Sequence, residues 1–141
     1  MIKSKFLAEL PYEPAVYALL AKGDNNGHVA YVGSSKQLSD KLNEQFGDEQ
    51  VNLPFRKLIS CGDPGRTLEI RWWLHPVFER QSALEAAEVI AFITLNPTVG
   101  SANSLSEEAE MLIIDEVFRT EMNDLFNSSP TGVRTFTYND I

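Results

Sequence analysis

The sequence has a single cysteine, few basic residues and no long hydrophobic run, and each shortage narrows the class of protein. Cys61 is the only cysteine among 141 residues, so no internal disulfide can form, as is usual in a reducing cytoplasm. No apolar stretch approaches the ~20 residues that span a bilayer. Glu9, Pro11 and Glu13 interrupt the N-terminal apolar residues, which argues against a signal peptide. We therefore expect a cytoplasmic protein without a membrane partner.

Basic residues are outnumbered by acidic ones. Twelve Lys and Arg face 20 Asp and Glu, which gives a net charge of −8 and a pI of about 4.7. Proteins that bind nucleic acid usually present a basic face to the phosphates. The charge balance therefore gives little support to a nucleic-acid partner, and a protein partner stays open. His28 and His75 lie far apart and no Cys/His group has the spacing of zinc ligands.

The length and composition fit one soluble domain over residues 1–141. A chain of this length can bury one hydrophobic core, and a hydrophobic fraction of 43% is ordinary for a globular domain. No internal repeat or low-complexity segment suggests a different organisation.

Two apolar segments, residues 15–21 and 28–33, flank an Asp-Asn-Asn-Gly turn at 24–27 and predict a β-hairpin. With a short loop, Tyr17 faces Tyr31 across the antiparallel pair, and opposed residues share a face of the sheet. Two tyrosines so placed more often serve packing than chemistry.

A third strand is predicted over residues 67–74, where apolar and polar side chains alternate. Trp73 lies on the otherwise polar face, which indicates that this face is partly covered as well. Helices are expected at 35–46, 52–60 and 82–95. Ser34 and Ser35 can each cap the first of them, and Ser34 with Gln37 makes a capping box. The predicted fold is α+β, a three-stranded antiparallel sheet flanked by helices.

A last, acidic amphipathic helix is predicted over residues 105–126, opened by a capping box of Ser104 and Glu107. Its apolar stripe consists of Met111, Ile114, Phe118, Met122 and Leu125. Its other face carries seven carboxylates against one arginine, the usual sign of a solvated face. We expect the tail from Asn127 onward to be loosely held.

Glu88 stands out because helical spacing places it on an apolar stripe with Leu84, Ala91, Phe92 and Leu95. A carboxylate in such a place must be paired, protonated or bound to a metal. A structural ion pair with Lys41 or Arg71 explains it as well as a metal does, and both interpretations stay open.

The residues Ala15-Val16-Tyr17, then Tyr31-Val32-Gly33, Ser35 and Leu38, followed by an amphipathic helix, resemble the core of the GIY-YIG nuclease superfamily. The resemblance covers residues 12–103 and leaves 104–141 as a C-terminal helix and tail. It implies a GIY-YIG-like fold and metal-dependent hydrolysis of nucleic acid.

The resemblance also implies roles for individual residues. Tyr17 or Tyr31 would act as the base or align the attacking water. Glu88, nine positions before Pro97 as in the family, would hold one Mg²⁺ or Mn²⁺. Lys41 occupies the position of the arginine that faces the phosphate.

Substrate contacts are implied for Gly33 and Ser35, which belong to the second motif, and for the neighbouring cation Lys36. Together with Lys41, Lys36 contributes to a small basic group near the expected site. A single carboxylate with water ligands suits a hard ion such as Mg²⁺.

The sequence departs from the family pattern at several positions. Lys41 keeps the positive charge of the arginine but lacks its planar, bidentate fork. The other departures are Ala15, Gln37, Gln45 and Gly100. Two hypotheses therefore remain: a Mg²⁺-dependent endonuclease with a lysine variant of the site, or a catalytically inactive GIY-YIG-like binding or regulatory module.

Overall fold

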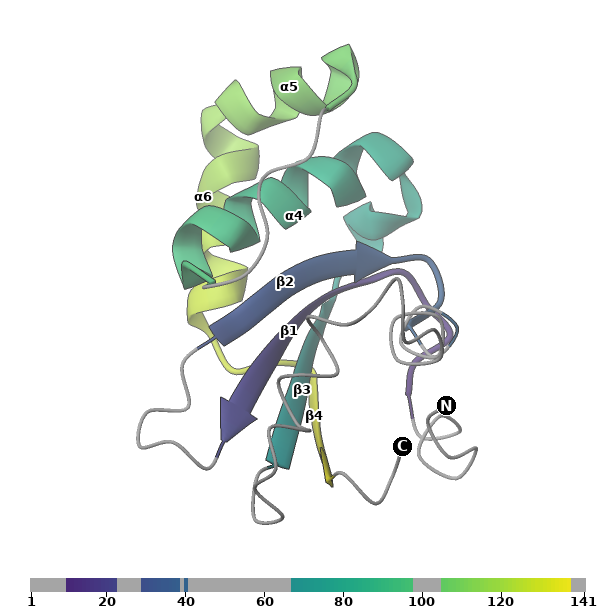
Figure 1. Cartoon of the computed structure of the whole chain (residues 1–141). Helices are drawn as coiled ribbons and strands as arrows, with labels where there is room; N and C mark the ends of the chain where they lie inside the picture. Colours follow the sequence, from purple (N-terminus) through teal and green to yellow (C-terminus); the bar gives the residue numbers. More distant parts are fainter. Residues whose placement is uncertain (1–9, 23–28, 39, 41–66, 98–104, 138–141) are drawn as a thin grey trace.

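Four strands pair in one antiparallel sheet in the order β2-β1-β3-β4 (Figure 1). The structure, a computed structural model, describes residues 10–22, 29–38, 40, 67–97 and 105–137. Along the chain the elements are β1 (Ala15–Lys22), β2 (Val29–Ser35), β3 (Thr67–Leu74), a 3-10 helix η1 (Pro76–Glu79), α4 (Gln81–Leu95), α5 (Glu107–Ile114), α6 (Glu116–Asn127) and β4 (Gly132–Thr137). The α+β class is confirmed, but the sheet has four strands and not three.

The fourth strand comes from the C-terminal tail, for which the prediction of a loose segment is wrong. Thr131 starts the pairing with β3: its N–H donates to the Trp72 carbonyl at 2.8 Å, and its Oγ1 accepts from the Leu74 N–H at 3.0 Å. β4 lies at the edge of the sheet, and Val133, Arg134 and Thr135 are all exposed. Because none of these three side chains is buried, the segment lacks the alternation of apolar and polar residues that predicts a strand.

The register of the β1–β2 pair differs from the predicted one by two residues. Tyr17 is opposite Gly33, and Tyr31 is opposite Leu19. Because side chains alternate with a period of two, a shift of two residues keeps Tyr17 and Tyr31 on the same face. The pairing is irregular between Leu19 and Leu20, as in a β-bulge.

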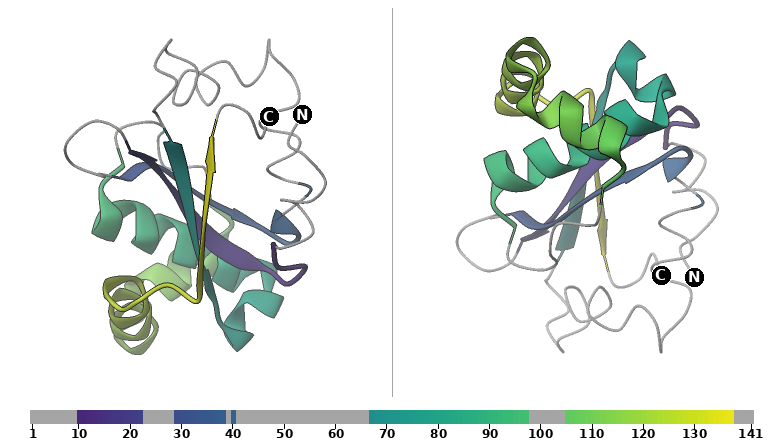
Figure 2. Two further views of the ribbon diagram at one scale, coloured as in Figure 1. Left: turned by 90° about the horizontal axis from the view of Figure 1, so that it is seen from below. Right: turned by 90° about the horizontal axis from the view of Figure 1, so that it is seen from above.

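The main core lies between the sheet and the helices α4, α5 and α6, which lie on the same side of the sheet (Figures 1 and 2). α4 packs on the sheet, α5 lies on the far side of α4, and α6 leads the chain back to β4 (Figure 1). Trp73, 3% exposed, belongs to this core and meets the Phe126 ring edge-on at a centroid distance of 5.5 Å. The face of β3 that carries Glu69, Arg71 and Trp73 is therefore covered by helices, as Trp73 indicates.

Small side chains let α4 approach both the sheet and the other two helices. The predicted helix 82–95 is confirmed with one residue added at its start, and Asn96, in the left-handed region at φ 50°, ends it. Its buried residues are mostly alanine: Ser82, Ala83, Leu84, Ala86, Ala87, Ile90 and Ala91. None of the helices in the described part of the chain is long and apolar enough to cross a membrane.

The predicted C-terminal helix is two helices, because Asp115 interrupts it. Asp115 is extended at φ −72° and ψ 117°, and its side chain accepts from the Phe118 N–H, so it caps α6. α5 begins with Ser106 as its N-cap, two residues later than predicted. The break divides the predicted apolar stripe: Phe118 and Met122 are buried, whereas Met111 and Ile114 are exposed.

β2 extends through Ser35, so Ser34 belongs to a strand and does not cap the next helix as predicted. Ser35 makes the turn instead, its Oγ accepting from the Gln37 N–H at 3.0 Å. Leu38, which is buried, and Asp40 are helical, as expected for the start of the predicted helix 35–46. The rest of that helix, the turn at 24–27 and the predicted helix 52–60 lie outside the described residues.

Candidate active site

Tyr17 and Tyr31 lie together on the face of the sheet opposite α4. Their ring centroids are 6.1 Å apart, with an angle of 45° between the ring planes. The core beneath the helices contains Val16, Ala18 and Leu20 of β1, so the alternate residues Tyr17 and Leu19 point to the other face. Tyr17 is fully buried and Tyr31 is partly exposed. Of the two tyrosines, Tyr31 is therefore the more exposed to solvent.

Gly33 is required by the way the Tyr17 ring lies. A Cβ at Gly33 would stand 2.7 Å from the Tyr17 Oη and 2.9 Å from the Tyr31 Cε1. The Tyr17 side chain therefore reaches from β1 across the edge strand β2, and its hydroxyl lies over the backbone of Gly33. The glycine of the second motif has a packing role here, because only a residue without a side chain leaves room for both rings.

The same arrangement recurs at the opposite edge of the sheet, on the same face. Tyr17 pairs with Trp72 in β3, and Trp72 pairs with Gly132 in β4. A Cβ at Gly132 would stand 2.1 Å from the Trp72 Cζ2. One row across the four strands thus reads Gly33, Tyr17, Trp72, Gly132, with each inner aromatic ring lying over the glycine of the adjacent edge strand. Aromatic side chains that cover edge glycines help to fix strand register.

Glu88 projects from α4 toward the end of β2, where its Oε1 accepts a hydrogen bond from the Ser34 Oγ at 3.0 Å. Ser34 follows Gly33 directly, so its side chain points to the helix-covered face of the sheet. Glu88 is partly exposed, although its stripe neighbours Leu84 and Ala91 are buried. Ser34 is a partner of Glu88 that the sequence does not predict, and its position after the glycine is the one signal for it.

The tyrosines and Glu88 therefore approach β2 from its two faces, at neighbouring residues Gly33 and Ser34. Ser35 ends the same strand, and Lys36 is exposed immediately after it. The structure thus gathers six of the seven predicted site residues around one end of β2. The seventh, Lys41, lies outside the described residues.

One of the two cations that could have paired with Glu88 is engaged elsewhere. Arg71 Nη2 lies 3.2 Å from Glu69 Oε2, on the strand that neighbours β1. The alternative of an Arg71–Glu88 ion pair is therefore wrong, and the alternative involving Lys41 is not tested. Glu85, one turn before Glu88, accepts from the Ser106 Oγ at 3.1 Å and ties α4 to the start of α5.

Glu88 is a single carboxylate beside the end of β2, a donor that a largely hydrated divalent ion can use. Within the described ranges no group of three His, Cys, Asp or Glu side chains could hold a metal. A zinc site needs three or four such ligands, whereas Mg²⁺ often keeps several waters and uses one or two carboxylates. Glu88, held by Ser34 and partly exposed, fits the second kind of site.

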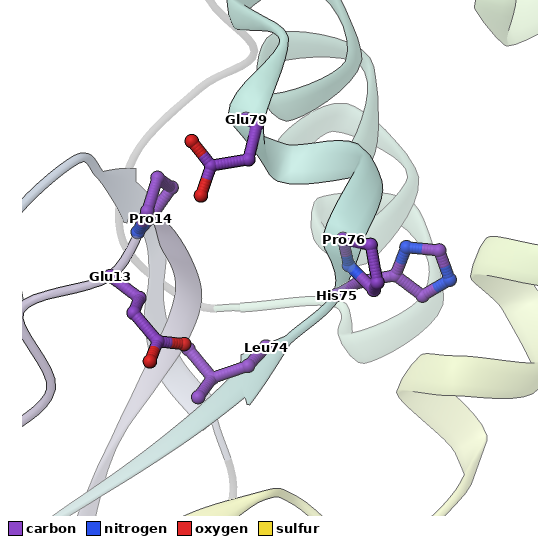
Figure 3. A pocket seen from close by; sticks show the side chains of 6 residues that line it. All are labelled: Glu13, Pro14, Leu74, His75, Pro76 and Glu79. Atoms are coloured by element: carbon purple, nitrogen blue, oxygen red, sulfur yellow. The ribbon is translucent and has the colours of Figure 1, made fainter.

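A pocket of about 230 Å³ opens at the same end of the sheet, beside the start of β1 and the end of β3. Figure 3 shows the carboxylates of Glu13 and Glu79 facing this space, while the His75 ring points away from it. His75 Nε2 lies 2.8 Å from Glu121 Oε1, and its Nδ1 accepts from the Val77 N–H at 3.0 Å. A pocket with two carboxylates repels phosphate, so a nucleic-acid substrate would not enter here.

The fold and the site together define an α+β domain in which a tyrosine pair and a glutamate flank one edge strand. No family model matches the chain, and no solved structure matches it. Two curated proteins are similar over a short stretch: the UvrABC system protein C of Legionella pneumophila strains Lens and Paris. Each is 36% identical over 55 residues, which is 39% of this chain and 8% of the relative. The chain thus covers less than a tenth of the length of these relatives.

Proposed function

We propose that this chain is a GIY-YIG-type, nuclease-like domain that hydrolyses phosphodiester bonds of nucleic acid with the help of one divalent metal ion. The observation that carries the proposal is the convergence on one end of β2. Tyr17 and Tyr31 pack together over Gly33, and Glu88 is hydrogen-bonded to the next residue, Ser34.

The local similarity to UvrABC system protein C supports this proposal. Proteins of that kind contain a GIY-YIG nuclease domain, the superfamily that the motif residues resemble. The 55 residues that match are less than half of this chain. The similarity therefore supports only a nuclease-related domain with nucleic acid as its partner. That this chain catalyses hydrolysis, uses a metal ion and acts on nucleic acid is our proposal.

The roles of the residues follow from their exposure and contacts. Tyr31, the more exposed of the two tyrosines, would orient the attacking water or take its proton. Tyr17, fully buried, positions the Tyr31 ring by packing against it at 6.1 Å. Ser34 holds the Glu88 carboxylate in one orientation through the 3.0 Å hydrogen bond. A Mg²⁺ ion at Glu88 would supply a positive charge that stabilises the charge developing on the phosphate oxygens.

The cations of the site would be lysines. Lys36 is exposed directly after Ser35, where a phosphate close to the end of β2 could reach it. Lys41 would take the role of the family's arginine as a point charge, without two parallel hydrogen bonds to one phosphate. A site of this kind should bind nucleic acid weakly and lose affinity as salt rises, because few phosphates are neutralised.

A catalytically inactive binding or regulatory module is the second candidate. It is favoured by the complete burial of Tyr17 and by the charge of residues 107–127, which carry seven carboxylates and one arginine. Such a segment repels DNA and leaves only the opposite part of the molecule for it.

The test is an endonuclease assay on the purified protein with single-stranded, duplex and branched DNA. Each substrate is incubated with Mg²⁺, with Mn²⁺ and with a chelator. We expect metal-dependent cutting of at least one substrate that the chelator stops. No cutting of any substrate, together with salt-sensitive binding, would leave the binding module as the function.

A further inference from the structure

Three apolar side chains at the junction of α5 and α6 are almost fully exposed, although apolar residues of this size are normally buried. Met111 is 69%, Ile114 74% and Val117 76% exposed. They lie within seven consecutive residues, on either side of the extended residue Asp115, and we call the three together the junction patch. A contiguous apolar patch rimmed by polar residues is the usual mark of a contact surface.

The junction patch is created by the helix break and is not left over from an incomplete core. Ala109 is buried, and Leu112 and Ile113 pack against the core, so α5 already uses its inward side. Asp115 then turns the chain, and α6 buries Phe118 and Met122. An unbroken helix would have aligned Met111 and Ile114 with those two residues on one stripe.

Exposed carboxylates lie next to the members of the junction patch in sequence and limit what can cover it. Glu108, Glu110, Asp115 and Glu116 are exposed and lie within three residues of a patch member in sequence. From Glu107 to Asn127 the chain carries seven carboxylates and one arginine, so this segment supplies six of the eight net negative charges. Nucleic acid and anionic lipid would be repelled. A second copy would also be repelled, because a symmetric contact places the same acidic surface on both sides.

We propose that the junction patch binds a partner protein through a basic amphipathic helix, whose apolar side covers Met111, Ile114 and Val117 and whose Lys and Arg side chains meet the surrounding carboxylates. This mode combines an apolar helix face with electrostatic complementarity at the rim. α5 lies beyond α4 from the sheet (Figure 1), so the patch is separate from the end of β2 where the candidate active site lies. The inference therefore holds whether or not the protein cuts nucleic acid.

Two peptides of identical composition test the proposal on the full chain. One is an 18-residue peptide of leucine and lysine with the leucines on one helical face; the other has its leucines spread around the helix. Binding is followed by amide chemical shifts at physiological salt. We expect the amphipathic peptide to bind at least roughly tenfold more tightly, and to shift residues of α5 and α6.

The variant that removes the patch carries Met111→Ser, Ile114→Ser and Val117→Ser together. Its matched control is Ile93→Ser on α4, which changes a side chain that is also 69% exposed. The triple variant should lose the roughly tenfold preference and keep its melting temperature within a few degrees, whereas the control should keep both.

Three results would overturn the proposal. Equal binding of the two peptides would show attraction by charge alone. Unchanged binding by the triple variant would place the contact elsewhere. Concentration-dependent dimerisation in sedimentation, lost in the triple variant, would identify a second copy as the occupant.

Discussion

The Ser34 hydroxyl donates a 3.0 Å hydrogen bond to the Glu88 carboxylate and so links the edge strand β2 to the middle of α4. The contact joins residues 54 positions apart in the chain and is partly buried. It gives a physical reason why a carboxylate is tolerated on an otherwise apolar side of α4, since a buried or half-buried charge needs a partner.

Replacing Ser34 by alanine removes that donor. We expect a loss of about 1 kcal/mol in the free energy of unfolding, because hydrogen bonds to partly buried charged groups contribute on that order. Ser34→Thr keeps a hydroxyl on a strand and should lose less than half as much. Urea unfolding measures both, and a cycle with Glu88→Ala gives the coupling. A coupling near zero would contradict the importance of this bond.

Gly33→Ala tests the packing of Tyr17 over the glycine. The new methyl group would stand 2.8 Å from the Tyr17 Cζ, so one or both tyrosine rings must move. We expect destabilisation by about 1–3 kcal/mol, the usual effect of an oversized side chain in a packed region. In a Tyr17→Leu background the same substitution should cost much less. Additive effects of the two substitutions would mean that the ring does not lie over Gly33.

Gly132→Ala probes the corresponding position in β4, where the methyl group would meet the body of the Trp72 ring at 2.1–2.7 Å. Destabilisation by about 1–3 kcal/mol is expected here too. Near-ultraviolet circular dichroism should change as the indole moves. Val133→Ala, at the adjacent and more exposed position, serves as the control. A stable variant with an unchanged spectrum would show that β4 does not pair with β3 in this register.

Lys41→Arg asks whether the lysine is a weaker version of the family's phosphate ligand. Arginine offers two parallel hydrogen bonds to a phosphate, so cutting should rise by several-fold if the site is active. The same assay on Lys41→Ala should show a loss of at least tenfold, since a phosphate-binding charge contributes about 1.4 kcal/mol or more to transition-state stabilisation. Equal rates for all three proteins would remove Lys41 from the site.

The parts of the fold that the sequence predicts well are those with one dominant local signal. Residues 67–74 alternate strictly, and β3 has those bounds. The alanine-rich segment from 82 to 95 is helical throughout, with Gln81 added at its start. In both segments, the element that the local sequence pattern predicts is the element found in the structure.

The failures come from places where two signals compete. The spacing of Met111, Ile114, Phe118 and Met122 fits one continuous helix. That signal competes with the N-cap signal of Asp115, which starts a new helix in the structure. In β4 the exposed side chains of an edge strand carry no alternation, so pairing with β3 could not be anticipated.

For the candidate site, the sequence predicts that the two tyrosines share a face of the sheet, but it does not predict which residues they contact. The predicted pairing placed Tyr31 directly opposite Tyr17, whereas Gly33 takes that place because it leaves room for the ring. The face shared by the two tyrosines was nevertheless right, since the register error was two residues. Ser34 belongs to β2 and not to a helix cap, because pairing with β1 extends the strand through Ser35.

The most direct test of the proposed function compares Glu88→Gln with Glu85→Gln. Both residues lie on α4, and both carboxylates accept a hydrogen bond from a serine, Ser34 in one case and Ser106 in the other. Glutamine preserves an acceptor oxygen in each, so both variants should unfold within about 1 kcal/mol of the original protein. We predict that Glu88→Gln abolishes metal-dependent cutting of DNA while Glu85→Gln cuts as the original protein does. Equal cutting by the two variants would contradict the role of Glu88 and with it the account of the site.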